Sequence, residues 1–167
     1  MTKPSQSNEG QTTQVTDVIE PRQIASRVLG EIQVTEEGTL TFPTGVLGFP
    51  EARDFTLVTT SREGFYWLQS LEHDTLTFLV MDPFLHVPDF SIEIDDEEMG
   101  VLGTEASEII VLAVVTLPAG PDDSLTANLQ GPLVINSAKG IGRQLILDDS
   151  PYGLRHTLDI SAALLAS

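Results

Sequence analysis

The stretch from Ile109 to Leu117 constrains the fold most, because it is almost uninterrupted Ile, Val, Leu and Ala and ends at Pro118. The run is far shorter than the roughly 20 apolar residues that a membrane helix needs. Its length and its β-branched side chains favour a strand over a helix. We therefore expect this segment to be the central strand of a sheet.

Other short segments also have the apolar or alternating pattern of strands, and turn residues separate them. These predicted strands are residues 28–34, 39–42, 55–59, 65–71, 76–81, 90–94, 126–135 and 144–147. The first two are expected to form a hairpin around the turn Thr35–Gly38. Asp95–Glu98 suit the positive end of a short helix, and Glu51–Asp54 suit a single helical turn. Many short strands with one short helix predict a mainly β fold, either a small antiparallel barrel or a sandwich.

Length and composition predict one domain preceded by a polar segment. Residues 1–26 are rich in Ser, Thr, Gln, Asn and Glu, so we expect a flexible leader there and a single β domain over 27–167. A chain of 167 residues and 18.1 kDa has the size of one core. The start of the chain lacks the apolar segment of a signal peptide, and the sequence has no cysteine for a disulfide or a thiolate zinc site. These features predict a cytoplasmic protein.

The charge balance says more about partners than about the fold. The chain has 8 Lys and Arg against 25 Asp and Glu, which gives a formal net charge of −17. Such a surface repels phosphate, so direct binding to nucleic acid or to an anionic membrane is not expected. It favours association with a basic protein, faster at low salt. The alternative is that the acids serve only solubility.

Motifs for metal, nucleotide or nucleophilic chemistry are absent from the sequence. His73, His86 and His156 lack the spacing of a helical metal site. The glycine-rich stretch Lys139–Arg143 fits neither phosphate-binding pattern, and no serine sits in a G-x-S-x-G elbow. We therefore predict no cofactor, metal or catalytic residue. Because triads assemble in space, an acidic enzyme or small-ligand carrier on the same β scaffold remains the alternative.

One surface for a protein partner is suggested by Asp82–Phe90, which carries two aromatic residues between two prolines beside the acidic run ending at Glu98. An apolar anchor rimmed by acids suits a basic, partly apolar partner. Phe90 begins an alternating segment and is better explained as core. Phe84 fits the core and the partner surface equally well.

Several stretches together, in order and at matching spacing, resemble the family of the flagellar assembly factor FliW. They are GEI (30–32), TFPTGVLGF (41–49), WLQS (67–70), FLVMDPF (78–84), PDF (88–90), TANL (126–129), PLVIN (132–136), QLIL (144–147) and YGLRH (152–156). The resemblance runs from about residue 27 to residue 158. The leader, His86 and Thr157 depart from the family pattern. Asn128 and Asn136 are expected to satisfy backbone groups in turns.

The resemblance implies a small β-barrel-like protein without enzymatic activity that binds flagellin in the cytoplasm. It also implies binding to CsrA, an RNA-binding translational repressor. Export of flagellin releases the FliW-like protein, which then antagonises CsrA allosterically and relieves repression of flagellin translation. On this basis we expect the acidic run to attract CsrA and two aromatic residues to make apolar contacts. The predicted partner-binding residues are Phe49, Phe84, Asp89, Glu93, Asp95, Asp96, Glu97 and Glu98.

Overall fold

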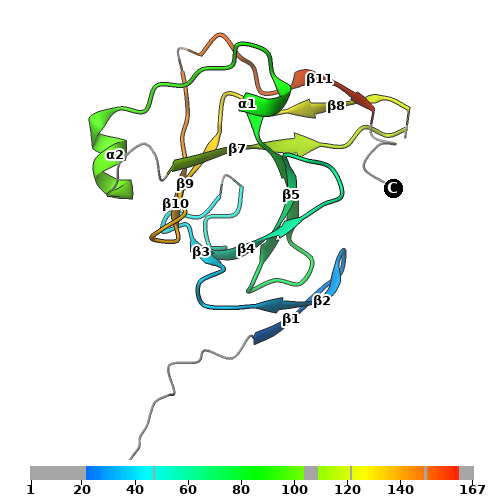
Figure 1. The fold of residues 1–167 in the computed structure, drawn as a ribbon, viewed down its shortest axis with the longest axis vertical. Coiled ribbons are helices and arrows are strands. Elements are labelled where there is room, and N and C mark those ends of the chain that lie inside the picture. The colour runs from blue at the N-terminus through cyan, green and yellow to red at the C-terminus, as the bar shows by residue number, and fades with distance from the viewer. Residues whose placement is uncertain (1–21, 47, 104–108, 121, 149, 162–167) are drawn as a thin grey trace, which may run out of the picture.

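This computed structural model describes residues 22–46, 48–103, 109–120, 122–148 and 150–161. This part of the chain contains eleven strands and two short helices (Figure 1). The strands are β1 (Arg22–Ser26), β2 (Gly30–Val34), β3 (Thr39–Thr41), β4 (Asp54–Thr59), β5 (Phe65–Ser70), β6 (Thr77–Met81), β7 (Ile109–Thr116), β8 (Ser124–Ala127), β9 (Leu133–Asn136), β10 (Ile141–Gln144) and β11 (His156–Ser161). The helices are α1 (Pro83–His86) and α2 (Asp96–Leu102). Neither is long and apolar enough to span a lipid bilayer.

Seven of the strands close into a barrel in the order β7-β6-β5-β4-β3-β10-β9, because β9 pairs back onto β7. Strands β8 and β11 extend the same sheet beyond the barrel. The paired strands run antiparallel except for β3 and β10, which run parallel. The predicted mainly β fold is confirmed, and of the two predicted architectures, barrel and sandwich, the structure has the barrel.

The central position of β7 explains its uninterrupted apolar sequence. Successive side chains of a strand point to opposite faces. Val111 and Val115 pack into one apolar cluster, while Leu112 and Val114 pack into a second cluster on the other face. Strand β6 divides its residues between the same two clusters. Because both faces of β7 are covered, its sequence cannot show the alternation of a half-exposed strand.

The predicted hairpin between residues 28–34 and 39–42 is wrong. Strand β2 pairs with β1 in a separate two-stranded sheet, whereas β3 pairs with β4. The turn itself is present, since Gly38 N donates to Thr35 O at 3.0 Å, but it joins two sheets. The boundary of the leader at Ser26 is also wrong, because β1 occupies Arg22–Ser26 and its Ser26 Oγ donates to Gln69 Oε1 at 2.6 Å. Residues 1–21 of the predicted leader lie outside the described residues.

The single strand predicted over residues 126–135 is two strands, β8 and β9, that pair with different parts of β7. Asn128 makes the interruption between them, since its Oδ1 accepts from Gln130 N at 3.1 Å and Gly131 N at 2.9 Å. Asn136 acts in the same way after β9, accepting from Ala138 N and Lys139 N while buried. The turn role expected for both asparagines is confirmed.

Residues 90–94 alternate between buried or half-buried and exposed, in line with the predicted wet face, but they form no strand. The alternation reflects a chain laid across the apolar core, with Phe90 7% exposed. The core interpretation of Phe90 is therefore confirmed.

Other predicted elements also need correction. The helical turn expected at Glu51–Asp54 is absent, whereas α1, which the sequence did not predict, follows β6 directly. The strand expected at 144–147 is displaced toward the N-terminus as β10, and β11 was not predicted. The structure therefore has two helices where the sequence predicted one. Helix α1 was missed because it is too short to show a helical period in the sequence.

Glu72 ties the β5–β6 turn to the start of β4 through its Oε1, which accepts from Arg53 N at 2.8 Å and Asp54 N at 3.0 Å. The bond from Asp54 N and then that from Arg53 N lower the pKa of this carboxyl, because they favour the charged form. A carboxyl whose pKa is lower in the folded state than in the unfolded state stabilises the folded protein at pH values above its unfolded-state pKa. This contribution to stability is lost as the pH falls through the folded-state pKa.

We therefore expect Glu72→Ala to cost about 1 kcal/mol of unfolding free energy at neutral pH. The difference from the parent protein should vanish in acid, where the parent carboxyl is also protonated. Urea unfolding at several pH values measures it. Glu37→Ala is the control, because the exposed Glu37 carboxylate makes no hydrogen bond within the described residues. An acid-insensitive difference would contradict the proposed linkage.

Candidate functional site

The predicted acidic helix start is confirmed at α2. The side chain of Asp95 caps the helix by accepting from Glu98 N at 2.8 Å, and three acids occupy the first turn. Carboxylates are favourable there because the first backbone N–H groups of a helix have no partner within the helix. The helix ends at Gly103, whose left-handed φ of 68° closes the last turn.

The acidic residues from 89 to 98, which we call the acidic surface, differ in exposure. Five of them are exposed, namely Asp89, Glu93, Asp95, Asp96 and Glu97. Glu98 is different, because its Oε1 lies 2.6 Å from Arg143 Nε in an ion pair and its side chain is 25% exposed. The acidic surface therefore presents five carboxylates to solvent with one acid neutralised internally.

Two of these acids, Asp89 and Asp95, also stabilise the local structure. Asp89 has a positive φ of 59°, the only non-glycine residue of the described chain in that region. Aspartate tolerates this conformation better than most residues. Its carbonyl oxygen accepts from the Tyr152 hydroxyl at 3.3 Å, which anchors the turn after α1. Asp95 is the helix cap described above, so its carboxylate is not wholly free for a partner.

Phe84 lies on α1, the short helix that Asp82 caps by accepting from Phe84 N at 2.9 Å. Its ring is 53% exposed, and the neighbouring Leu85 is 55% exposed. The ring centroid of Phe84 lies 5.0 Å from that of buried Phe90, which in turn contacts Tyr152 at 5.1 Å. Phe84 is thus an exposed residue whose ring packs against the aromatic side chain of buried Phe90.

His86 turns inward at the end of α1. Its ring packs on Phe65 at a centroid distance of 4.8 Å. Nε2 donates to the carbonyl oxygen of Glu63 at 2.9 Å. The residue therefore joins α1 to the turn before β5, and Leu85 provides the exposed apolar side chain at this end of the helix.

Phe49 is 44% exposed, but the structure places it in a different aromatic cluster from Phe84. Its ring lies 5.6 Å from Phe78, which packs toward Phe55 in the barrel core. Phe84 contacts the other core, through Phe90. The two predicted apolar anchors therefore belong to two surfaces.

Two strongly exposed apolar residues were not among the predicted partner-binding residues. Ile146 is 57% exposed and Leu154 is 62% exposed. A signal for Ile146 is present in the sequence, because three consecutive apolar residues, 145–147, cannot all face one core in an extended chain. Leu145 and Leu147 point inward, which leaves Ile146 outside.

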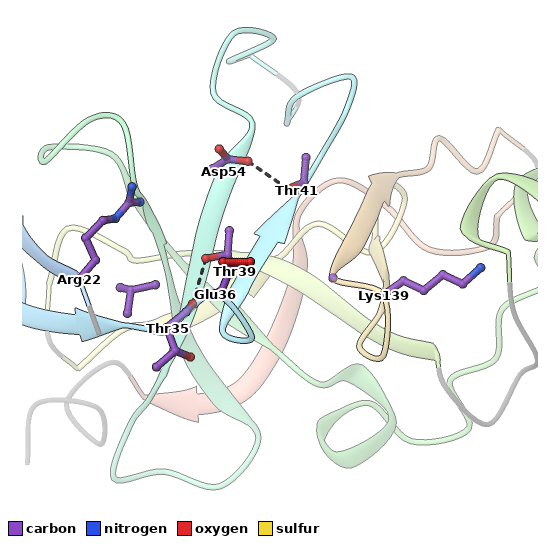
Figure 2. A pocket seen from close by; sticks show the side chains of 9 residues that line it. Arg22, Thr35, Glu36, Thr39, Thr41, Asp54 and Lys139 are labelled. Carbon is purple, nitrogen blue, oxygen red and sulfur yellow. Dashed lines mark hydrogen bonds between the residues drawn. The ribbon is translucent and has the colours of Figure 1, made fainter. Parts of the chain in front are cut away.

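One hollow that bears on the carrier or enzyme alternative, of about 510 Å³, lies beside β3 and β4. Figure 2 shows that the side chains of Arg22 and Lys139 lie on opposite sides of it and do not point toward each other. Asp54 accepts from Thr41 Oγ1 at 3.0 Å, so its carboxylate is already engaged. The charged groups of this hollow do not converge, and no three potential metal ligands cluster within the described ranges.

A family model described as "FliW protein" matches residues 23–158. This chain belongs to the FliW family. The match begins inside β1, which agrees with the inclusion of that strand in the domain. The family is that of a flagellar assembly factor.

Relatives and one solved structure agree with the FliW assignment. The flagellar assembly factor FliW of Treponema denticola is 36% identical over 146 residues, which cover 87% of this chain and 97% of that protein. The FliW of Geobacillus kaustophilus is 36% identical over 135 residues, covering 81% and 94%. A crystal structure of the flagellar assembly factor FliW has a TM-score of 0.75 at 33% identity and covers 81% of this chain and 96% of that chain.

Proposed function

We propose that this FliW-family protein is a cytoplasmic, non-enzymatic regulator that alternates between two protein partners. It holds flagellin, and when flagellin is exported it binds CsrA and antagonises that repressor allosterically. Translation of flagellin then resumes. The exposed acidic surface is the observation that carries the proposal, because five carboxylates of a short segment face solvent there.

Charge complementarity supports CsrA as the partner of the acidic surface. CsrA binds RNA, and RNA-binding proteins carry basic surfaces. A protein of net charge −17 with clustered acids attracts a cationic partner over several ångströms and speeds its encounter. The attraction is screened within about a Debye length, which is ~8 Å at physiological salt. Binding of CsrA should therefore weaken as salt rises.

Calorimetric titration of the full chain with CsrA from the same organism tests the proposal. The titration is run at two salt concentrations, with and without flagellin. We expect binding that weakens with salt and that a saturating amount of flagellin abolishes. Binding of neither protein would overturn the proposal, and CsrA binding that flagellin leaves unchanged would overturn the alternation.

A further inference from the structure

The weakest closure of the barrel lies between β3 and β10. These strands run parallel and pair at one position, Ile141 with Thr41. Beyond this position the segments that follow β3 and β10 separate. A hollow of about 310 Å³ lies between Val46 on one side and Gln144 and Ile146 on the other.

The backbone beside this hollow has an open edge at Ile146. Leu145 N donates to Pro132 O at 2.9 Å, and Leu147 N donates to Gln130 O at 2.8 Å. Alternate residues of an extended chain direct their backbone groups to opposite edges, so the N–H and C=O of Ile146 point toward the hollow. Within the described part of the chain neither group has a hydrogen-bond partner. Such an edge can pair with an added strand.

Two further hollows continue this one in both directions. One, lined by Phe78 and Leu154, shares Val46 and Gln144 with it and carries Arg155. The other, of about 550 Å³, shares Ile146 and is lined by Glu93 and Asp148. We call the joined hollows the groove. Its middle is uncharged and mostly apolar, one end carries Arg155, and the other end is acidic.

We propose that the groove binds an extended segment of flagellin as an added strand beside Ile146. The proposal rests on the proposed function. The segment has apolar side chains at alternate positions and a basic side chain at the end next to Glu93 and Asp148. Flagellin is the partner because the acidic surface already suits the cationic CsrA, whereas the middle of the groove carries no charge.

The shared residue Glu93 gives this assignment a regulatory consequence. It belongs to the acidic surface and also lines the acidic end of the groove. A basic side chain of flagellin bound next to Glu93 neutralises part of the negative charge that attracts CsrA. It also occupies space at the edge of the acidic surface. The two partners therefore compete where the two surfaces meet, although most of each surface is separate.

The matched variants are Ile146→Glu and Val28→Glu in the full chain. Both residues are exposed to a similar degree, 57% and 55%, so neither substitution disturbs the core. Val28 lies at the turn of the β1–β2 hairpin, which Figure 1 shows outside the barrel on the side away from α1. Ile146→Glu is expected to weaken flagellin binding by about tenfold or more, as loss of an interface anchor does. Val28→Glu should change it less than about twofold, and CsrA binding should change little in either variant.

Amide hydrogen exchange of the ¹⁵N-labelled protein tests the added strand itself. The Ile146 amide is expected to exchange fast in the free protein and to be strongly protected when flagellin is bound. The amides of Leu145 and Leu147, which already have partners, should change far less. If the parent protein binds flagellin while Ile146→Glu binds equally well or the Ile146 amide stays unprotected, the groove proposal is wrong and the proposed function stands. If the parent protein binds neither flagellin nor CsrA, the proposed function itself fails.

Discussion

Replacing Gly45 by alanine is expected to destabilise the protein by about 3 kcal/mol, the sum of a left-handed backbone cost and a steric overlap. Gly45 has a φ of +76°, and a Cβ there would lie 2.5–2.6 Å from Cα, C and O of Pro50. These are backbone atoms, so no rotamer change relieves the overlap. The loop is also fixed at Gly45 N, which donates to Phe42 O at 2.8 Å.

Urea unfolding of three alanine variants separates the two contributions. Gly48 has a φ of +89° but open space around its Cβ position, so Gly48→Ala carries the backbone cost alone, about 1–2 kcal/mol. Gly100 lies in α2 with open space and no positive φ, so Gly100→Ala is expected to stabilise by about 0.5–1 kcal/mol. Equal losses for Gly45→Ala and Gly48→Ala would contradict a role for the Pro50 backbone.

The Gly45 loop also links stability to the groove. Val46 and Phe49 form an isolated antiparallel bridge, and Val46 lines two of the three hollows. A loop displaced by a Cβ at Gly45 would move Val46 and alter the groove floor. We therefore expect surviving folded Gly45→Ala protein to bind flagellin more weakly, while the acidic surface, none of whose residues lines a hollow with Val46, keeps its CsrA affinity.

Elements whose identity depends on local sequence were predicted well. The apolar strand β7 and the acidic cap of α2 each follow from neighbouring residues, through burial and helix-end electrostatics. Pairing is not local, and there the prediction failed. The sequence of Thr35–Gly38 specifies a turn, but whether the turn joins paired strands depends on β1 and β4, which offer each strand a competing partner.

The candidate site was predicted in part for the same reason. The exposed carboxylates of the acidic surface are visible as a charge run, because charged side chains avoid burial. The sequence could not predict that Phe49 and Phe84 lie on separate surfaces. Their placement depends on which of the two apolar clusters each aromatic residue packs against, and that is set by the tertiary fold. The outward side chain of Ile146 could have been predicted from the apolar triplet 145–147, but its open backbone edge could not, because that edge lies at the seam between β3 and β10.

Neutralising four exposed acids of the acidic surface is expected to slow CsrA association by about tenfold at low salt. The variant combines Asp89→Asn, Glu93→Gln, Asp96→Asn and Glu97→Gln, which changes the net charge from −17 to −13 by removing four negative charges. Asn tolerates the positive φ of Asp89. Asp95 and Glu98 are left unchanged, because one caps α2 and the other pairs with Arg143, so the fold should be unaffected.

A control with the same change in net charge distinguishes local from global electrostatics. It combines Glu31→Gln, Glu36→Gln, Glu37→Gln and Asp74→Asn, all exposed and located around the β1–β2 hairpin and the turns beside it. Stopped-flow association at several salt concentrations is the measurement. The acidic-surface variant should lose most of the salt dependence, while the control keeps it, because screening limits each charge to a range of about 8–10 Å. Equal slowing in both variants would mean that CsrA responds to net charge, and the acidic surface would then not be its docking site.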